Sequence, residues 1–237
     1  MSGRWPLWVL LASSCGVAGS ASDELAAIDR AYFARDVAAL ARLQEQLRSA
    51  PGTGEYARAF VAFRGLQLAV WQHDKSAATR WGSSCVEAAG RAGKTLPAEA
   101  LALESACYGY LASQGGLSAI RNGSRSGKRI EAAAGLAPTN PRVLLVDALA
   151  LYFRPAFVGG DKVKARALVK SATEEFARGN PAVAGGRGWG EGEAWYWLAR
   201  MSAEQGDDEA ARAALAESRR RLPNWRRLDE PLIQGAR

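Results

Sequence analysis

The chain has 237 residues, of which 48% are hydrophobic and 23% are charged, and this composition excludes an intrinsically disordered protein. Alanine, leucine and arginine are abundant while β-branched residues are sparse, which favours helices over strands. The formal net charge of +7 allows attraction to acidic proteins, lipid headgroups or nucleic acid. Much of the excess lies at residues 219–221 and 226–227, where cations suit the C-terminal end of a helix.

Residues 1–21 are predicted to be an export signal. Arg4 precedes a short apolar run at 5–12, and small residues continue to Ala21, as in a secretory signal peptide. The run is shorter than the about 20 residues that a membrane-spanning helix needs, and no later segment is long and apolar enough. We therefore expect a periplasmic protein without a resident transmembrane helix. Anchoring as a lipoprotein through Cys15 is the alternative, although the residues before it form a poor lipoprotein box.

Residues 22–224 are predicted to form a domain made only of helices. Apolar or small residues recur there at three- and four-residue spacing, and no segment alternates apolar and polar residues as a half-buried strand does. Turn and stop signals separate the runs. The predicted helices cover residues 22–34, 36–49, 55–73, 75–92, 97–113, 117–135, 140–153, 161–178, 191–205 and 207–222. The glycine-rich stretch 179–190 is expected to be a mobile loop or an exposed lip on the stack of helices, and residues 225–237 a C-terminal cap or tail.

The clearest repeat unit lies at residues 194–224. A Gly206-Asp207 turn separates two short amphipathic runs, and Pro223-Asn224 stops the second. The order of large and small residues resembles a tetratricopeptide repeat, although Ser202 stands where an aromatic is usual. The residues that have the size the motif needs are Trp195, Leu198, Ala199, Ala211, Leu215, Ser218 and Pro223.

Weaker copies of this unit lie upstream. The predicted helices at 140–153 and 161–178 are joined by a longer loop that ends in Gly159-Gly160-Asp161, which is similar to a variant in tetratricopeptide proteins of the bacterial envelope. The resemblance implies an all-α, right-handed solenoid of antiparallel helix pairs, about four to five in number. Such a solenoid presents an extended concave surface, which these folds usually use for recognition.

No catalytic constellation is evident. The single histidine, His73, lies in a predicted turn, and one imidazole cannot build a multi-histidine metal site or a triad without partners. Residues 88–95 fit a permissive phosphate-loop pattern, but a predicted helix precedes them and Pro97 follows, whereas a working phosphate loop follows a buried strand. We expect no enzyme activity, no metal and no cofactor.

Cys85 and Cys107 are predicted to lie at similar height in neighbouring helices. They stand at nearly equal distances from the turn near residues 94–96, and a rise of 1.5 Å per residue leaves a mismatch of only about 3 Å. If their Cβ vectors converge, an exported protein should oxidise them to a disulfide. Two packed free thiols are the alternative.

The helix at 191–205 carries the candidate partner-binding residues. Tyr196 and Arg200 are one turn apart on the face that, by the resemblance, lines the concave groove, and Glu193 and Glu204 share that face. An aromatic ring beside a guanidinium suits a peptide or anion contact. Family members that hold the terminal carboxylate of a peptide use Lys and Asn at groove positions, so that clamp does not transfer to this chain.

Two functions follow from these observations. The first is an exported, non-catalytic scaffold or adaptor that binds a protein or peptide of the cell envelope through its groove, and does not bind nucleic acid. The alternative is a periplasmic solute-binding component of a transport system. The two differ in burial, because a solute binder needs a closed, mostly apolar pocket and a peptide binder needs an open groove.

Overall fold

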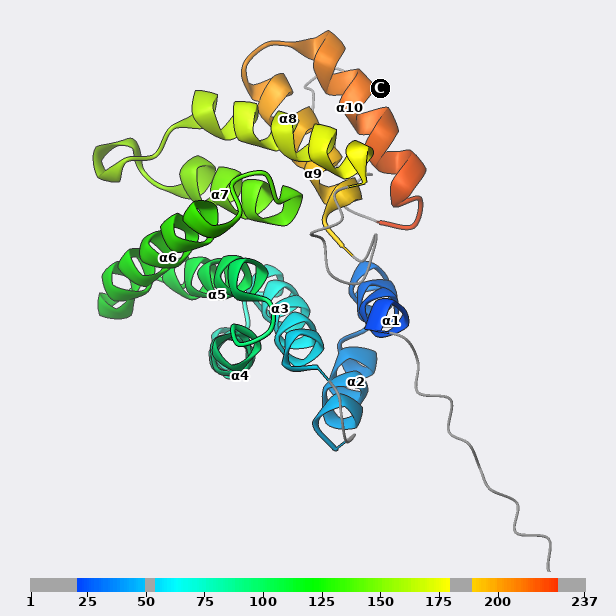
Figure 1. The fold of residues 1–237 in the computed structure, drawn as a ribbon, viewed down its shortest axis with the longest axis vertical. Coiled ribbons are helices and arrows are strands. Elements are labelled where there is room, and N and C mark those ends of the chain that lie inside the picture. The colour runs from blue at the N-terminus through cyan, green and yellow to red at the C-terminus, as the bar shows by residue number, and fades with distance from the viewer. Residues whose placement is uncertain (1–20, 50–53, 180–188, 226–237) are drawn as a thin grey trace, which may run out of the picture.

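The computed structural model describes residues 21–49, 54–179 and 189–225, and over these ranges the chain is all-α, with no strand (Figure 1). This confirms that the fold is all-α, and the helix bounds agree with the expected ones to within a few residues. The elements are α1 (Ala21–Phe33), α2 (Val37–Ser49), α3 (Glu55–Trp71), α4 (Lys75–Ala92), α5 (Pro97–Ala112), α6 (Leu117–Leu136), α7 (Pro141–Phe153), the 3-10 helix η1 (Ala156–Val158), α8 (Lys162–Arg178), α9 (Glu191–Glu204) and α10 (Asp208–Arg221).

Helices that follow one another in the chain pack against one another. The most extensive contacts join α3 with α4, α5 with α6, α9 with α10 and α7 with α8, and smaller ones link these pairs in chain order. The path curves from α1 past α6 and back, so that α1 lies close to the start of α9 and to the end of α10 (Figure 1). Consecutive helices therefore form pairs, and the far ends of the described chain meet.

Side-chain caps fix where several helices begin. The carboxylate of Asp74 accepts a hydrogen bond from the Ala77 amide at the start of α4, and Asp207 accepts one from the Ala210 amide at the start of α10. Such caps satisfy amides that have no partner inside the helix. The predicted Gly206-Asp207 turn is present, with Gly206 at a positive φ of 76°.

Glycines allow close approach between helices of the N-terminal half. A Cβ atom built on Gly65 of α3 would lie 2.3 Å from the Trp81 ring of α4, and one on Gly82 of α4 would lie 2.5 Å from Leu111 of α5. Real Cβ atoms do not come so near, so each glycine makes room for the large side chain opposite. The close packing of α3, α4 and α5 depends on these two positions.

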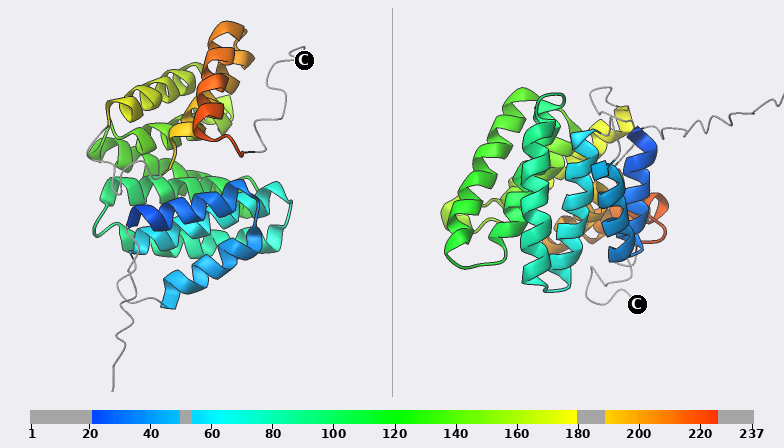
Figure 2. Two further views of the ribbon diagram at one scale, coloured as in Figure 1. Left: turned by 90° about the vertical axis from the view of Figure 1, so that its right-hand side faces the viewer. Right: turned by 90° about the horizontal axis from the view of Figure 1, so that it is seen from below.

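Two clusters of buried side chains form the interior. The first lies mainly between α1 and α5 and includes Trp189, and the second lies mainly between α7 and α10 and includes Trp225. The helices of the second cluster lie above those of the first along the longest axis (Figure 2). Trp225, the last described residue, packs its ring edge-on against Phe33 and Tyr196, with centroids 5.5 and 4.9 Å away.

Cys85 of α4 and Cys107 of α5 are both fully buried. Their sulfur atoms lie at disulfide distance, and their Cα atoms are 6.3 Å apart. The predicted proximity is therefore confirmed. Its basis is the short turn between α4 and α5, which brings residues at equal distance from the turn to the same height.

The remaining predictions concern the two termini, membrane-spanning helices and the phosphate-loop pattern. Residues 1–20, which carry Cys15 and nearly all of the expected signal, and the tail beyond Trp225 lie outside the described residues. No described helix has the length and apolarity to cross a bilayer. Within residues 88–95, α4 continues to Ala92 and a turn follows, so the phosphate-loop pattern falls on the end of a helix and not on a strand.

Candidate functional site

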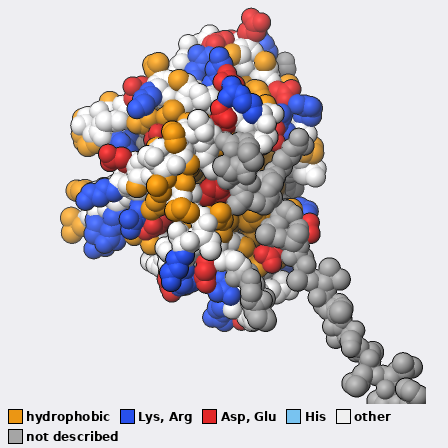
Figure 3. Space-filling model, viewed as in Figure 1, with side chains coloured by type: hydrophobic (Ala, Val, Ile, Leu, Met, Phe, Trp, Pro, Cys, Tyr) orange, Lys and Arg blue, Asp and Glu red, His pale blue; other side chains and the backbone are white. Residues whose placement is uncertain are grey.

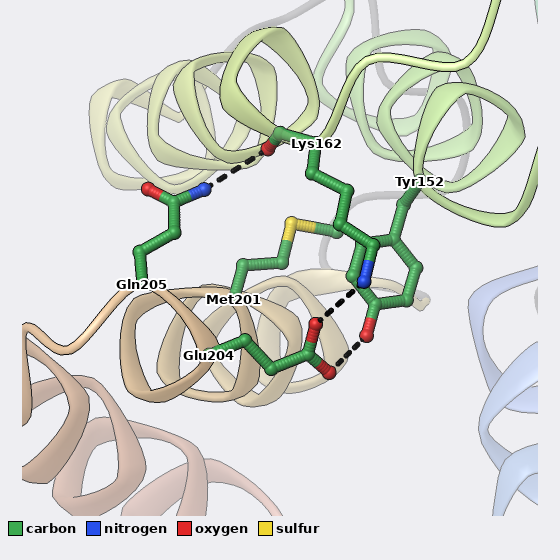
Figure 4. Close-up of a pocket in the computed structure, with 5 residues that line it drawn as sticks. All are labelled: Tyr152, Lys162, Met201, Glu204 and Gln205. Carbon is green, nitrogen blue, oxygen red and sulfur yellow. Dashed lines mark hydrogen bonds and ion pairs between the residues drawn. The ribbon is translucent and has the colours of Figure 1, made fainter. Parts of the chain in front are cut away.

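A small hollow of about 60 Å³ lies where α7 ends, α8 begins and α9 ends. Its walls come from three elements, so no single helix could form it (Figure 4). The side chain of Lys162 is 65% exposed, and the hollow therefore opens to solvent. The residues that line it are Tyr152, Lys162, Met201, Glu204 and Gln205.

The carboxylate of Glu204 is the centre of this site. It accepts hydrogen bonds from the Tyr152 hydroxyl, from Lys162 Nζ at 3.2 Å and from Arg200 Nε at 3.4 Å. Partial burial by itself raises the pKa of Glu204, but the hydrogen bonds from Tyr152 and Lys162 outweigh it and hold the pKa below its usual value. Two cations thus share one carboxylate, which leaves the site with an excess of positive charge.

Aromatic rings surround the two cations. Lys162 Nζ lies 5.1 Å from the centroid of the Tyr152 ring, and the Arg200 guanidinium lies 5.6 Å from that of Trp197. Phe153 packs edge-on against Trp197 with centroids 5.4 Å apart, yet 63% of Phe153 stays exposed. An incoming group would therefore meet an apolar ring and two positive charges side by side.

Of the four residues expected in a groove, Arg200 and Glu204 lie at this site. The structure places the other two elsewhere. Tyr196 is fully buried and contacts Trp197 and Trp225, with centroids 5.4 and 4.9 Å away. An exposed groove position for Tyr196 is therefore wrong. The reason is that the end of the described chain folds over this part of α9.

Glu193 is also buried, and it binds Arg64 of α3. Arg64 Nη1 and Nη2 donate to its two carboxylate oxygens at 2.7 and 2.8 Å, and Arg64 Nε donates to Asp29 of α1 at 2.8 Å. The expectation that Glu193 lines an open groove is thus wrong as well. The face that carries Glu193 and Tyr196 is covered, because the two ends of the helical path meet there.

Trp189 fills the space between these ends. Its ring stacks on Phe60 of α3 with centroids 5.2 Å apart, and its Nε1 donates to the Tyr56 hydroxyl at 2.9 Å. Its carbonyl accepts from Nε of the buried Arg142 at 3.1 Å, and Arg142 also pairs with Glu99 at 2.9 Å. Aromatic and paired charged side chains therefore occupy the interior that an open concave groove would leave empty.

Several residues of the site were not found from the sequence. Tyr152 and Lys162 belong to a different predicted helix pair, and Met201 occupies a buried position of α9. Periodicity alone does not say which helix pairs face one another. No group of three or more His, Cys, Asp or Glu side chains able to hold a metal ion occurs in the described parts of the chain. His73 lies in a turn with a positive φ of 60° and is exposed.

Comparisons with known proteins add the fold alone. No family model matches the chain, and no curated protein matches its sequence significantly. Among solved structures, the HusA haemophore from Porphyromonas gingivalis has a similar fold, with a TM-score of 0.63 over 77% of this chain and 91% of that one. The two sequences are 22% identical.

Proposed function

We propose that this chain is an exported binding protein, built of tetratricopeptide-type helix pairs, that takes a protein or peptide partner at the surface of α7, α8 and α9 and does not catalyse a reaction. The pairing of consecutive helices in chain order supports the solenoid interpretation. The similar fold of HusA, a haemophore by its name, supports a binding role.

The observation that carries this proposal is the sharing of Glu204 between Lys162 and Arg200. Glu204 is shared between Arg200 and Lys162, so it neutralises each cation only in part. A carboxylate of a partner can therefore bind either cation. An apolar side chain next to that carboxylate would cover the exposed ring of Phe153. The site thus fits an acidic segment that carries an apolar residue, and aromatic and arginine side chains are the usual anchors of such contacts.

Retention of a partner from envelope extract tests the proposal. Arg200→Ala and Lys162→Ala should each lower the retained amount, whereas Arg212→Ala, at an exposed position of α10, should not. Tyr196→Ala is unsuitable as a probe, because it would remove a buried ring and disturb the fold. Equal retention by all three variants and the unmodified protein would show that this surface does not bind the partner.

A small-molecule role is the second candidate, and the fold shared with a haemophore favours testing a tetrapyrrole first. The hollow of about 60 Å³ is far smaller than the roughly 300–1,000 Å³ of sites that enclose a small ligand. Met201 lines the hollow with a sulfur atom that could bind the metal of a tetrapyrrole, but the residue is only 1% exposed. Titration with haemin, followed by absorbance, separates the two: saturable binding that Arg200→Ala and Lys162→Ala leave unchanged would favour a solute-binding role at another surface.

A further inference from the structure

Several large apolar side chains at the start of α6 and in η1 are exposed. Leu117 and Ile120, at the start of α6, are 95% and 80% exposed, and Phe157 and Val158 of η1 are 89% and 53% exposed. The start of α6 and η1 both project from the left edge in Figure 1, below and above the end of α7. Arg154, just before η1, packs against the middle of α6, because its guanidinium lies 3.6 Å from where a Cβ of Gly127 would be.

Cations lie on the same outward face of α6. Arg121, Arg125 and Lys128 follow Leu117 at helical spacing, and all three are exposed. Lys and Arg side chains gather over this part of the surface (Figure 3). We call Leu117, Ile120, Arg121, Lys128 and Phe157 the α6–η1 edge.

Little negative charge opposes these cations. Within the described residues, Arg121 and Lys128 form no ion pair with an acidic side chain. Glu104, the carboxylate that α5 presents to α6, is taken by Arg129 at 2.9 Å. Glu131 is the one acidic residue of α6 itself, and it follows Lys128 toward the far end of the helix. The part of α6 from Leu117 to Lys128 is therefore a positive surface with apolar side chains at its tip.

This combination suits a lipid surface better than a protein. The core of a protein interface is a packed apolar patch in which lysine is depleted. Here the apolar side chains instead protrude singly at two ends, with Lys and Arg between them. Apolar tips that enter the boundary between headgroups and acyl chains, and cations that meet lipid phosphates, are how interfacial helices bind.

We propose that the α6–η1 edge docks on the surface of an anionic phospholipid bilayer, with Leu117, Ile120 and Phe157 inserted among the headgroups and Arg121 and Lys128 on the phosphates. The chain then lies on a membrane without spanning it. This docking is independent of partner binding at α7, α8 and α9.

Co-sedimentation of the purified protein with vesicles tests this. It should bind vesicles of phosphatidylcholine that contain about one third phosphatidylglycerol, and not phosphatidylcholine alone, and added salt should weaken the binding. Arg121→Glu/Lys128→Glu should lower the partition coefficient by at least about tenfold, since each cation contributes to the attraction. Leu117→Ser/Phe157→Ser should lower it as well, and these exposed positions should leave the circular dichroism spectrum unchanged.

The matched control is Lys75→Glu/Arg212→Glu, which changes the net charge equally at exposed positions of α4 and α10. It should retain most of the binding. An equal loss in this control would assign the attraction to total charge and overturn the proposal, as would binding to neutral vesicles as strong as to anionic ones. Absence of binding to either kind of vesicle would also overturn it, without bearing on the retention of a partner by Arg200 and Lys162.

Discussion

Arg64 of α3 and Glu193 of α9 stand 129 positions apart in the sequence and are joined by two hydrogen bonds of 2.7 and 2.8 Å. The guanidinium also lies 4.2 Å from the centroid of the Tyr32 ring and binds Asp29. One buried cation thus holds three helices of the chain, α1, α3 and α9, at a single point.

Replacement of Arg64 should destabilise the protein strongly. Arg64→Met would leave Asp29 and Glu193 buried without their cation, and breaking a buried pair in this way typically costs about 3–5 kcal/mol. Urea denaturation followed by circular dichroism measures the loss. Arg48→Met, which removes an exposed arginine that pairs with Glu45, is the control and should change the midpoint very little. Similar midpoints for the two variants would contradict the role given to Arg64.

Asp29 should make stability depend on pH. Burial, followed by the neighbouring Glu193, raises the pKa of Asp29 to about 7, although Arg64 offsets part of the rise. The folded protein therefore binds more protons than the unfolded chain between about pH 4 and about pH 7, so this contribution to the free energy of unfolding falls as pH rises through that range. Urea denaturation at about pH 5 and about pH 7.5 should show a smaller fall in Asp29→Asn than in the unmodified protein. Parallel profiles would show that Asp29 is already ionised at the lower pH.

Substitutions of Tyr196 and Arg200 should have different effects, the first on stability and the second on partner binding. Tyr196→Ala removes a fully buried ring and should lower the free energy of unfolding by about 3–5 kcal/mol. Arg200 lies at the surface over Trp197, and Arg200→Ala should leave the thermal midpoint close to that of the unmodified protein. Differential scanning fluorimetry compares the two. A stable Tyr196→Ala variant would mean that the ring is not part of the interior.

The disulfide between Cys85 and Cys107 should stabilise the fold. A chain that begins after residue 21 has only Cys85 and Cys107, so thiol titration in denaturant should find none before reduction and two after it. Closing this loop should contribute about 2–4 kcal/mol, which Cys85→Ser/Cys107→Ser would lose. Two reactive thiols in the unreduced, correctly exported protein would exclude the bond.

Gly160 should not tolerate a side chain. A Cβ there would lie 1.9 Å from the backbone oxygen of Arg154, so Gly160→Ala should displace the loop before α8 and cost about 1–3 kcal/mol. Gly135→Ala is the control, because nothing lies within 4 Å of the added atom in α6. That substitution should be neutral or stabilising by about 0.5–1 kcal/mol. Thermal unfolding of the two variants provides the comparison, and equal midpoints would contradict the steric argument.

The helices could be predicted from the sequence because their signals are local. Asp74 and Asp207 occupy the cap positions, and Pro141 begins α7 directly after the capping Asn140. The approach of Cys85 to Cys107 was also predictable, since a short turn between two helices sets the height of residues on both sides of it.

The covered face of α9 could not be predicted in the same way. Spacing places Glu193, Tyr196, Arg200 and Glu204 on related faces of one helix, but it does not say what lies over each. Whether that face is open depends on how far the helical path curves, which is a sum of many small rotations between helices. One local signal was present: Arg64 stands in the apolar run from Phe60 to Ala69, where a charge needs a partner.

The position of Trp189 between the two ends of the helical path affects how the protein unfolds. In an array whose units touch only their neighbours, a terminal unit can detach while the rest stays folded. Here detachment of the last helices would separate the Trp189 ring from Phe60. It would also break the buried ion pair between Glu193 and Arg64 of α3. Neither end of the helical array can unfold alone, so the protein should unfold in one cooperative step. Its terminal helices should also resist proteolysis.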